Sequence, residues 1–343
     1  MAETRFLTDN NLTRKQHSRD LFSIILPAVE FDSLVSKGKN EPIQIRTELG
    51  KGKGDQITFG IRLPLTGEGE VGYDTVEGNE EQLIFRDFNM KIEELNHAVD
   101  SGGQMDQQRM PYDLVVEGKD GLQEWWSDKL SDYIINGLAG NSAFRIAGQV
   151  FAQAIGEPDS DHHLTMNDVS EGSMTAADEM DLAFLDALKQ RAEMPTGTAF
   201  KLRPLIRNGK KYFKVILHTY VYDRLRQNTN VAQWGDLLRA ANKLQEPNIE
   251  FEYNGMLVMK SERVPQVQTN EYRNVLLGAQ AGCWAWGGAG ESKSSVMTFV
   301  PYTRDAKRFL MFRGGGIFGF QKATFNSLDY GVIAGTSFAT ALQ

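Results

Sequence analysis

The alternation of apolar and polar residues predicts a two-stranded ribbon in the first third of the chain. Between Ile57 and Leu63 every second residue is apolar, the period-two pattern of a half-buried strand. A second strand is expected over Leu83 to Ile92. The connection, residues 64–81, is too long and too acidic for a tight turn, so it predicts a projecting arm. An isolated ribbon is marginal in water, so a long one implies a covering surface on the same chain or on another copy.

Apolar residues at three- and four-residue steps predict a long helix from Pro111 to Leu138. At the usual rise per residue this helix would be roughly 40 Å long, longer than most globular helices. Gly118 and Gly121 fall inside it, where a kink is plausible because glycine weakens helices. The helix is expected to be the backbone of the fold.

The remaining elements do not follow a regular order of alternating strands and helices. Upstream of the ribbon, residues 1–50 are polar around one apolar segment, Phe22 to Val29, and predict an arm. Two further helices are expected over Ala176–Ala192 and Trp234–Leu244. Strands are expected in two hairpins, across Asn208-Gly209 and Asn254-Gly255, and in a glycine-interrupted final part: Phe200–Ile206, Tyr212–Leu217, Met256–Met259, Val296–Val300, Arg308–Phe312, Ile317–Phe320 and Tyr330–Ala334. This mixture predicts an α+β fold and argues against a doubly wound parallel sheet.

Composition places the chain among ordinary globular proteins. Of 343 residues, 41% are hydrophobic and 24% charged, which excludes disordered, collagenous and disulfide-rich classes. The single cysteine, Cys283, cannot form an intrachain disulfide, so we expect folding in a reducing, cytoplasmic compartment. The apolar stretch near the start is far shorter than the roughly 20 residues of a membrane span, and no membrane association is expected.

Charge is distributed unevenly along the chain. The net charge is -8, which disfavours a protein whose task is to grip a phosphate backbone. Residues 1–62 carry +2, residues 63–200 carry -19, and residues 201–343 carry +9. The acidic middle and basic end could attract each other within a monomer, or let copies meet with opposite patches facing. A simply solvated acidic surface is the alternative.

Two glycine-rich motifs resemble nucleotide-binding loops but lack the necessary context. Gly314, Gly316 and Gly319 match the dinucleotide spacing, yet strand-like residues follow where a helix should. We interpret them as glycines at a bulge or tight corner between strands. Residues 287–294 resemble a phosphate-binding loop, but Ser292 replaces the second glycine and no clear strand precedes it, so a solvated loop is favoured.

One cluster has the composition of a metal site. Asp159, Asp161, His162 and His163 fall within five residues, and these side chains are common ligands of zinc and iron. Adjacent histidines point apart in most backbones, and the calcium-loop pattern fails, so an exposed acidic loop is favoured. Cys283 lies in an apolar run typical of inert packing, and no serine-hydrolase or zincin motif occurs. We therefore predict no catalytic residues, no metal and no cofactor.

Several segments resemble one known family. The runs at Glu77–Phe85 and Asn96–Leu114 closely resemble the major capsid proteins of short-tailed, double-stranded-DNA bacteriophages of the enquatrovirus kind. Looser matches follow in the same order at Tyr220–Arg226, Asn274–Gly287 and Phe325–Ser337. Residues 141–200 contain no motif of the family.

The resemblance implies an HK-97-like fold and a structural function. It implies a shell protein, not an enzyme, whose hexamers and pentamers form the icosahedral head around the double-stranded DNA of a tailed phage. It implies a virion protein that folds and assembles in the bacterial host cytoplasm, with scaffolding, portal and decoration proteins as partners and weak, non-specific DNA contact. The implied division is an N-terminal arm (1–50), an extended β-hairpin loop (51–95), a peripheral domain with the spine helix (96–138), an axial domain (139–270) and return strands of the peripheral domain (271–343).

The acidic loop is the candidate inter-subunit site. We hypothesise that its carboxylates lie over a neighbouring copy and meet basic residues from Lys201 onward. The candidate residues are Glu68, Glu70, Asp74, Glu77, Glu80 and Glu81. Two alternatives remain open: an encapsulin-like cellular compartment, and a metal-dependent hydrolase that uses Asp159, Asp161, His162 and His163.

Overall fold

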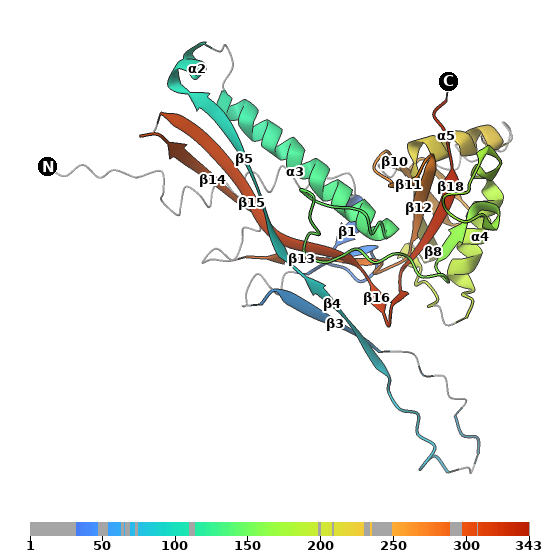
Figure 1. Cartoon of the computed structure of the whole chain (residues 1–343). Coiled ribbons are helices and arrows are strands. Elements are labelled where there is room, and N and C mark those ends of the chain that lie inside the picture. Colours follow the sequence, from blue (N-terminus) through green and yellow to red (C-terminus); the bar gives the residue numbers. More distant parts are fainter. Residues whose placement is uncertain are drawn as a thin grey trace.

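Two β-sheets lie towards opposite ends of an elongated molecule, and a two-stranded ribbon extends from the region between them (Figure 1). The computed structural model describes residues 32–46, 54–62, 65, 69–72, 75–109, 114–197, 200–207, 209–229, 234, 249–288, 297–306 and 308–342. Among the helices in these ranges, none combines the length and hydropathy that a membrane span requires.

The first sheet has six strands, and its longest strand, β15 (Phe309–Lys322), pairs with three of the others. β15 lies antiparallel to β13, β14 and β5. The remaining strands are β1 (Val35–Ser36), β2 (Ile43–Arg46), β5 (Glu93–Gly103), β13 (Gly282–Gly287) and β14 (Met297–Arg304). This sheet is therefore assembled from segments that lie far apart in the sequence.

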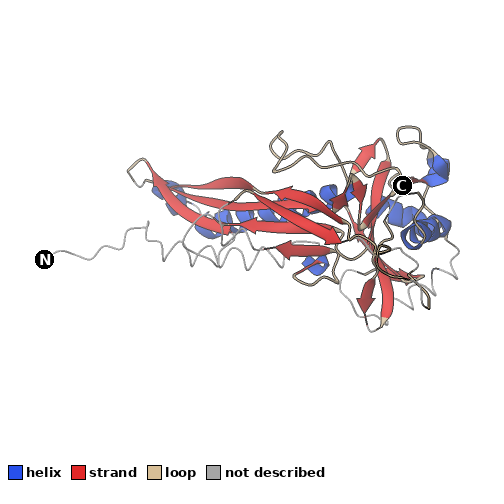
Figure 2. Ribbon diagram, turned by 90° about the horizontal axis from the view of Figure 1, so that it is seen from below, coloured by secondary structure: helices blue, strands red, loops and turns tan. Residues whose placement is uncertain are grey.

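One long helix, α3 (Leu114–Ala139), runs along the first sheet (Figure 2). Its buried side chains, among them Trp126 and Tyr133, pack on Phe318 and Phe320 of β15 in one hydrophobic core. The Tyr133 hydroxyl donates a hydrogen bond to the Phe320 carbonyl at 3.1 Å. A short helix, α2 (Gln104–Arg109), joins β5 to the chain before α3.

The predicted long helix is confirmed, with one difference. It runs without interruption through Gly118 and Gly121, where a kink was plausible. A Cβ atom at Gly118 would lie 3.4 Å from Val99 of β5, so the strand packs closely against the helix at this position. This packing holds a regular helix despite the weak intrinsic preference of glycine. Pro111, the predicted start, lies outside the described residues.

The second sheet has eight strands and carries two helices. Its path runs β6-β18-β12-β8-β10-β9, with β11 beside β12 and β7 beside β8. The strands are β6 (His163–Thr165), β7 (Leu205–Arg207), β8 (Lys210–His218), β9 (Phe251–Tyr253), β10 (Met256–Ser261), β11 (Gln266–Gln268), β12 (Glu271–Leu277) and β18 (Val332–Phe338). The helices are α4 (Leu182–Glu193) and α5 (Thr219–Asn228), which share a second core with the sheet.

Short elements complete the described chain. Three turns of 3-10 helix are Asp32–Leu34, Met166–Asp168 and Ala176–Asp178. The helix expected from Ala176 begins only at Leu182, because the Asp181 carboxylate caps it by accepting from the Phe184 N–H at 2.8 Å. Two-stranded pairs are β3 (Gln56–Arg62) with β4 (Phe85–Lys91), and β16 (Thr324–Phe325) with β17 (Leu328–Asp329). The ribbon and the strand pairing of both predicted hairpins are thus confirmed, although β7 is shorter than expected.

The prediction for the glycine-rich end is wrong in one respect. Arg308–Phe312 and Ile317–Phe320 fall on a single strand, β15, from Phe309 onward, and no bulge or corner lies at Gly314, Gly316 or Gly319. The strand remains regular because glycine admits close neighbours on both sides. A Cβ atom at Gly319 would lie 2.1 Å from the Lys91 carbonyl oxygen.

The α+β prediction is confirmed: most strand pairs are antiparallel, and helices cover the sheets without βα alternation. Most of the few parallel pairs, such as β8 with β10, join segments distant in sequence, whereas β1 and β2 are close neighbours along the chain. The helix expected at Trp234–Leu244 lies outside the described residues apart from Trp234, as do most of residues 1–50 and most of the 287–294 loop.

Candidate assembly interface

The inner half of the ribbon is anchored in the core of its own subunit. β3 and β4 pair antiparallel from Gln56 opposite Lys91 to Arg62 opposite Phe85. Phe88 and Met90 of β4 are buried in a small core with Cys283, Ala285, Ala323 and Phe325. Phe59 of β3 stacks on Phe88 with ring centroids 4.9 Å apart. The period-two pattern thus marks a face that packs on the first sheet.

The outer half of the ribbon carries large apolar side chains that are exposed. Residues 75–84 lead away from both sheets (Figure 1). Val71 is 82% exposed and Phe85 67%, and Leu83 and Ile84 are each more than half exposed. Four such side chains within one loop favour contact with another molecule, because burying them releases hydration free energy.

The candidate carboxylates share this loop. Glu70, Glu77, Glu80 and Glu81 are exposed, while Glu68 and Asp74 lie outside the described residues. Glu70 accepts a hydrogen bond from the Asn79 amide at 2.8 Å, and Glu80 accepts one from the Gly78 N–H at 2.9 Å. Both contacts stay within the loop, so they shape it without neutralising its charge.

The proposed metal ligands do not converge. The two ring nitrogens of His162 contact the Asp159 carboxylate at 2.8 Å and the Phe200 carbonyl at 3.2 Å. His163 Nε2 instead lies 2.9 Å from the Thr336 hydroxyl and 3.1 Å from Glu171. Within the described ranges no group of three or more His, Cys, Asp or Glu side chains is arranged to hold a metal ion.

The expectation of an exposed acidic loop at this cluster is wrong. His162 is only 1% exposed, and the Asp159 side chain is 11% exposed. Burial by itself disfavours the charged imidazolium, but the hydrogen bond and charge of Asp159 together raise the pKa of His162 above its usual value. Burial likewise opposes ionisation of Asp159, yet the bonds from His162 and the Asp329 N–H lower its pKa to about 2.

One buried and one partly buried ion pair extend this network across the junction of the two sheets. At the end of β15, Lys322 pairs with Asp329 at 2.8 Å, and both side chains are 3% exposed. In β12, Arg273 pairs with Glu171 at 2.6 Å and donates to the Gly140 carbonyl just beyond α3. Burial lowers the pKa of Lys322 and raises that of Asp329, and their mutual attraction opposes both shifts. The network therefore ties α3 and β15 to the second sheet.

The remaining sequence motifs have structural positions. Cys283 is buried in β13, in agreement with its interpretation as packing. The Trp-rich segment before the 287–294 motif is a true strand, β13, contrary to expectation. His97 stacks on Trp125 with centroids 4.2 Å apart, and His218 accepts from the Tyr220 N–H to cap α5. These contacts give both histidines a structural role and not that of a general base beside a nucleophile.

Sequence reasoning missed the exposed apolar residues of the loop. Val71, Val76 and the run Leu83–Phe85 fall among acidic residues and break the expected period-two alternation. A second strand that began at Leu83 would have paired these side chains within the ribbon, but β4 begins only at Phe85. Apolar residues inside a charged, strand-free segment are the signal that could have revealed them.

Comparison with known proteins gives one consistent result. A family model described as phage capsid protein matches residues 7–341. The major capsid protein of Pseudomonas phage KPP25 is 28% identical over 174 residues. That alignment covers 45% of this chain and 46% of the relative, so it spans less than half of each protein.

Solved capsid structures match over nearly the whole chain. The capsid of Ralstonia phage GP4 has a TM-score of 0.80 at 21% identity and covers 100% of this chain and 96% of its own. The Cyanophage Pam1 capsid has a TM-score of 0.71 at 16% identity, covering 92% and 94%. The head structure of Helicobacter pylori bacteriophage KHP40 has a TM-score of 0.68 at 15% identity, covering 91% of each chain.

Proposed function

This chain belongs to the phage capsid protein family as a major capsid protein with the HK97-like fold, and we propose that its copies form the hexamers and pentamers of an icosahedral head. The head encloses the double-stranded DNA genome of a tailed phage. The observation that supports this assembly most directly is the outer half of the ribbon, which presents exposed apolar and acidic side chains together. An isolated subunit leaves this surface uncovered in the described residues, and a neighbouring copy would bury it.

We propose the following division into parts. Residues 1–50 form the arm and 51–95 the extended loop. Residues 96–138 form a peripheral domain with α3, 139–270 the axial domain, and 271–343 return strands to the periphery. The two sheets support this division, although the first core also includes Ile216, Val275 and Val332 of the second sheet. Because β12 and β18 lie in the second sheet, the proposed axial part also takes strands from residues 271–343.

The role is assembly without catalysis. A metal-dependent hydrolase would need the side chains of Asp159, Asp161, His162 and His163 to converge. In the structure each histidine is held by different partners, and His162 is buried. The site's geometry favours a structural network.

Further partners follow from the function of a container. Scaffolding, portal and decoration proteins would act during or after shell growth in the bacterial cytoplasm, and the finished protein resides in the virion. DNA would be contacted weakly, because a net charge of -8 suits a genome that must be packed and later released. An encapsulin-like compartment is the alternative, and packaged DNA in purified particles would exclude it.

Replacing residues 64–81 by a short turn tests the assembly role. We expect a soluble, folded subunit that forms few or no shells, because the surface that covers its neighbour is gone. Sedimentation and electron microscopy of particles measure assembly, and circular dichroism checks the fold. A variant in which a Gly/Ser loop of equal length replaces residues 64–81 keeps the length of the loop and removes its side chains. It therefore shows whether assembly depends on these side chains or only on loop length. Normal particles from the truncated protein would contradict the proposal.

A further inference from the structure

A run of basic residues on the second sheet matches the acidic loop in number and sign. Residues 201–214 contain six basic residues and no acidic one: Lys201, Arg203, Arg207, Lys210, Lys211 and Lys214. Residues 63–85 contain six acidic residues and no basic one. Complementary patches of this kind set register and partner choice between molecules.

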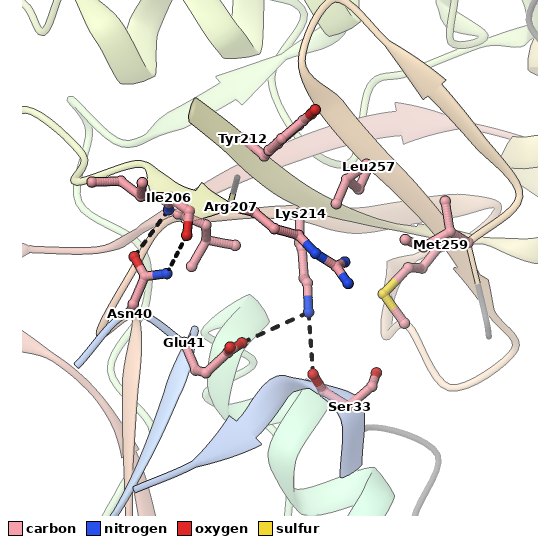
Figure 3. Close-up of a pocket in the computed structure, with 11 residues that line it drawn as sticks. Ser33, Asn40, Glu41, Ile206, Arg207, Tyr212, Lys214, Leu257 and Met259 are labelled. Atoms are coloured by element: carbon pink, nitrogen blue, oxygen red, sulfur yellow. Dashed lines mark hydrogen bonds and ion pairs between the residues drawn. The ribbon is translucent and has the colours of Figure 1, made fainter. Parts of the chain in front are cut away.

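This basic run borders a cavity of about 430 Å³ (Figure 3). The cavity lies between the β7–β8 hairpin, β10 and the segment from Ser33 to Glu41. Asn40 fixes that segment to the edge of β7, since its amide donates to the Ile206 carbonyl at 2.6 Å and accepts from the Ile206 N–H at 2.9 Å. Asn40 thus binds both the N–H and the carbonyl of Ile206, which holds two walls of the cavity together.

The lining combines aliphatic side chains with the partly buried ammonium of Lys214. Ile206, Leu257 and Met259 supply apolar surface, and Ile206 is 53% exposed at the rim. Lys214 Nζ donates to the Ser33 carbonyl at 3.1 Å and forms a long ion pair with Glu41 at 3.9 Å. An ammonium has three donors, so Lys214 can also donate to a further anionic group.

The electrostatics of the pocket favour an anion as well. Burial lowers the pKa of Lys214, and Arg207 lowers it further, while Glu41 raises it. Burial thus disfavours the charged form of Lys214 although Glu41 lies close by. A second carboxylate placed near Lys214 would stabilise the ammonium.

We infer that this pocket receives residues 80–85 of the extended loop of a second copy, with a loop carboxylate on Lys214 and the Leu83–Phe85 side chains on the aliphatic wall. The inference rests on the proposed shell and names the surface that the loop meets. Residues 80–85, Glu-Glu-Gln-Leu-Ile-Phe, are exposed along their whole length and place carboxylates two to five positions before three large apolar side chains. A DNA phosphate would match the charge of the pocket and leave its aliphatic wall unused.

Disulfide trapping tests the contact directly. The double variant Leu83→Cys with Ile206→Cys should give covalent oligomers in oxidised particles, because each copy would place its loop cysteine at the rim of the next copy's pocket. The native Cys283 is 4% exposed and adds little background. Leu83→Cys with Met194→Cys is the matched control, since Met194 is also exposed, at 71%, and lies at the end of α4.

Charge exchange provides a second, independent readout. Lys210→Glu with Lys211→Glu should raise the subunit concentration required for shells by about tenfold, equivalent to about 1.4 kcal/mol. Adding Glu80→Lys and Glu81→Lys should restore assembly, which a mere folding defect would not allow. Lys214→Met should weaken assembly without changing the far-ultraviolet spectrum.

The outcomes separate this inference from the proposed function. Shells without cross-links from the Leu83–Ile206 pair, together with no rescue by charge exchange, would overturn the pocket and leave the shell intact. Normal assembly of Lys214→Met with loss of retained DNA would assign the pocket to nucleic acid and also overturn it. Normal shells after removal of residues 64–81 would instead contradict the proposed function itself.

Discussion

At the scale of single residues, the junction of the two sheets depends on charged side chains that are buried together with partners of opposite charge. Lys322 and Asp329 satisfy each other, and Lys322 also donates to the Glu157 carbonyl at 3.0 Å. His162 has an acceptor at each ring nitrogen, the Asp159 carboxylate and the Phe200 carbonyl. Two acceptors require two N–H donors, so the geometry suits the protonated imidazolium. Removing any one charge leaves its partner buried and uncompensated.

Lys322→Met should lower the free energy of unfolding by about 3–5 kcal/mol, because it strands the Asp329 carboxylate in the core. The double variant Lys322→Met with Asp329→Leu should cost clearly less, since both charges are then absent. Urea unfolding of the unassembled subunit, followed by tryptophan fluorescence, measures both values. Equal losses in the single and double variants would show that the pair makes no coupled contribution.

The pH dependence follows from the same network. A raised pKa of His162 means that its stabilisation is complete below about 6.5, the unfolded value, and is lost as pH rises through the folded value. The lowered pKa of Asp159 acts at the other end, with stabilisation lost as pH falls from about 4 towards 2.

His162→Gln should therefore flatten the decline in stability above neutral pH, measured as urea midpoints between about pH 5 and 9. His218 provides the control. Burial lowers the pKa of His218 to about 4, so the stabilisation that comes from its neutral form is lost as pH falls from 6.5 to 4. His218→Asn should change only that acidic range. An unchanged alkaline slope in His162→Gln would contradict the role given to the imidazolium.

At the scale of elements, β15 shows how glycine can serve a long central strand. Three of its glycines lie where neighbouring groups approach too closely for a side chain: Asn96 at Gly315, the Lys91 backbone at Gly319 and Trp126 at Gly314. Glycine usually weakens a strand. Here the loss is offset because β5, the end of β4 and α3 can all contact β15.

Gly319→Ala should destabilise the subunit by about 1–3 kcal/mol, because its Cβ would overlap the Lys91 carbonyl oxygen and force the backbone apart. Gly60→Ala is the matched control. Gly60 lies in β3, and no atom lies within 4 Å of the position that an alanine Cβ would take, so its replacement should be neutral or stabilising by up to about 1 kcal/mol. Thermal unfolding of both variants checks the difference, and similar melting temperatures would refute the close-packing account.

At the scale of the whole molecule, one subunit buries its own junction but exposes its loop. The inner ribbon packs at Phe88 and Met90, while the outer ribbon offers acidic and apolar groups. A single exposed ion pair contributes only about 0–1 kcal/mol, yet a closed shell repeats each contact many times. Weak contacts then suffice for assembly and also allow misplaced copies to leave.

Assembly should therefore weaken with salt. Between about 0.1 M and about 1 M ionic strength the screening length falls from about 10 Å to about 3 Å, so contacts between loop carboxylates and basic residues lose strength. The subunit concentration at which shells appear in light scattering should rise accordingly. The variant Glu70→Gln, Glu77→Gln, Glu80→Gln should show a weaker dependence. An identical salt response in both proteins would exclude the loop carboxylates from the contact.

The local sequence pattern was enough to predict the ribbon, the long helix, the pairing of both hairpins and the α+β class. Each of these depends on the periodicity of neighbouring residues or on the residues that favour turns. The six loop carboxylates were also evident from the sequence alone, as was their opposition to a basic C-terminal part. The continuity of β15, the burial of Asp159 and His162, and the pocket at Lys214 were decided only by tertiary structure. Each of these depends on contacts between groups more than 30 residues apart. A local sequence pattern does not specify which distant residues will be in contact or will be buried together.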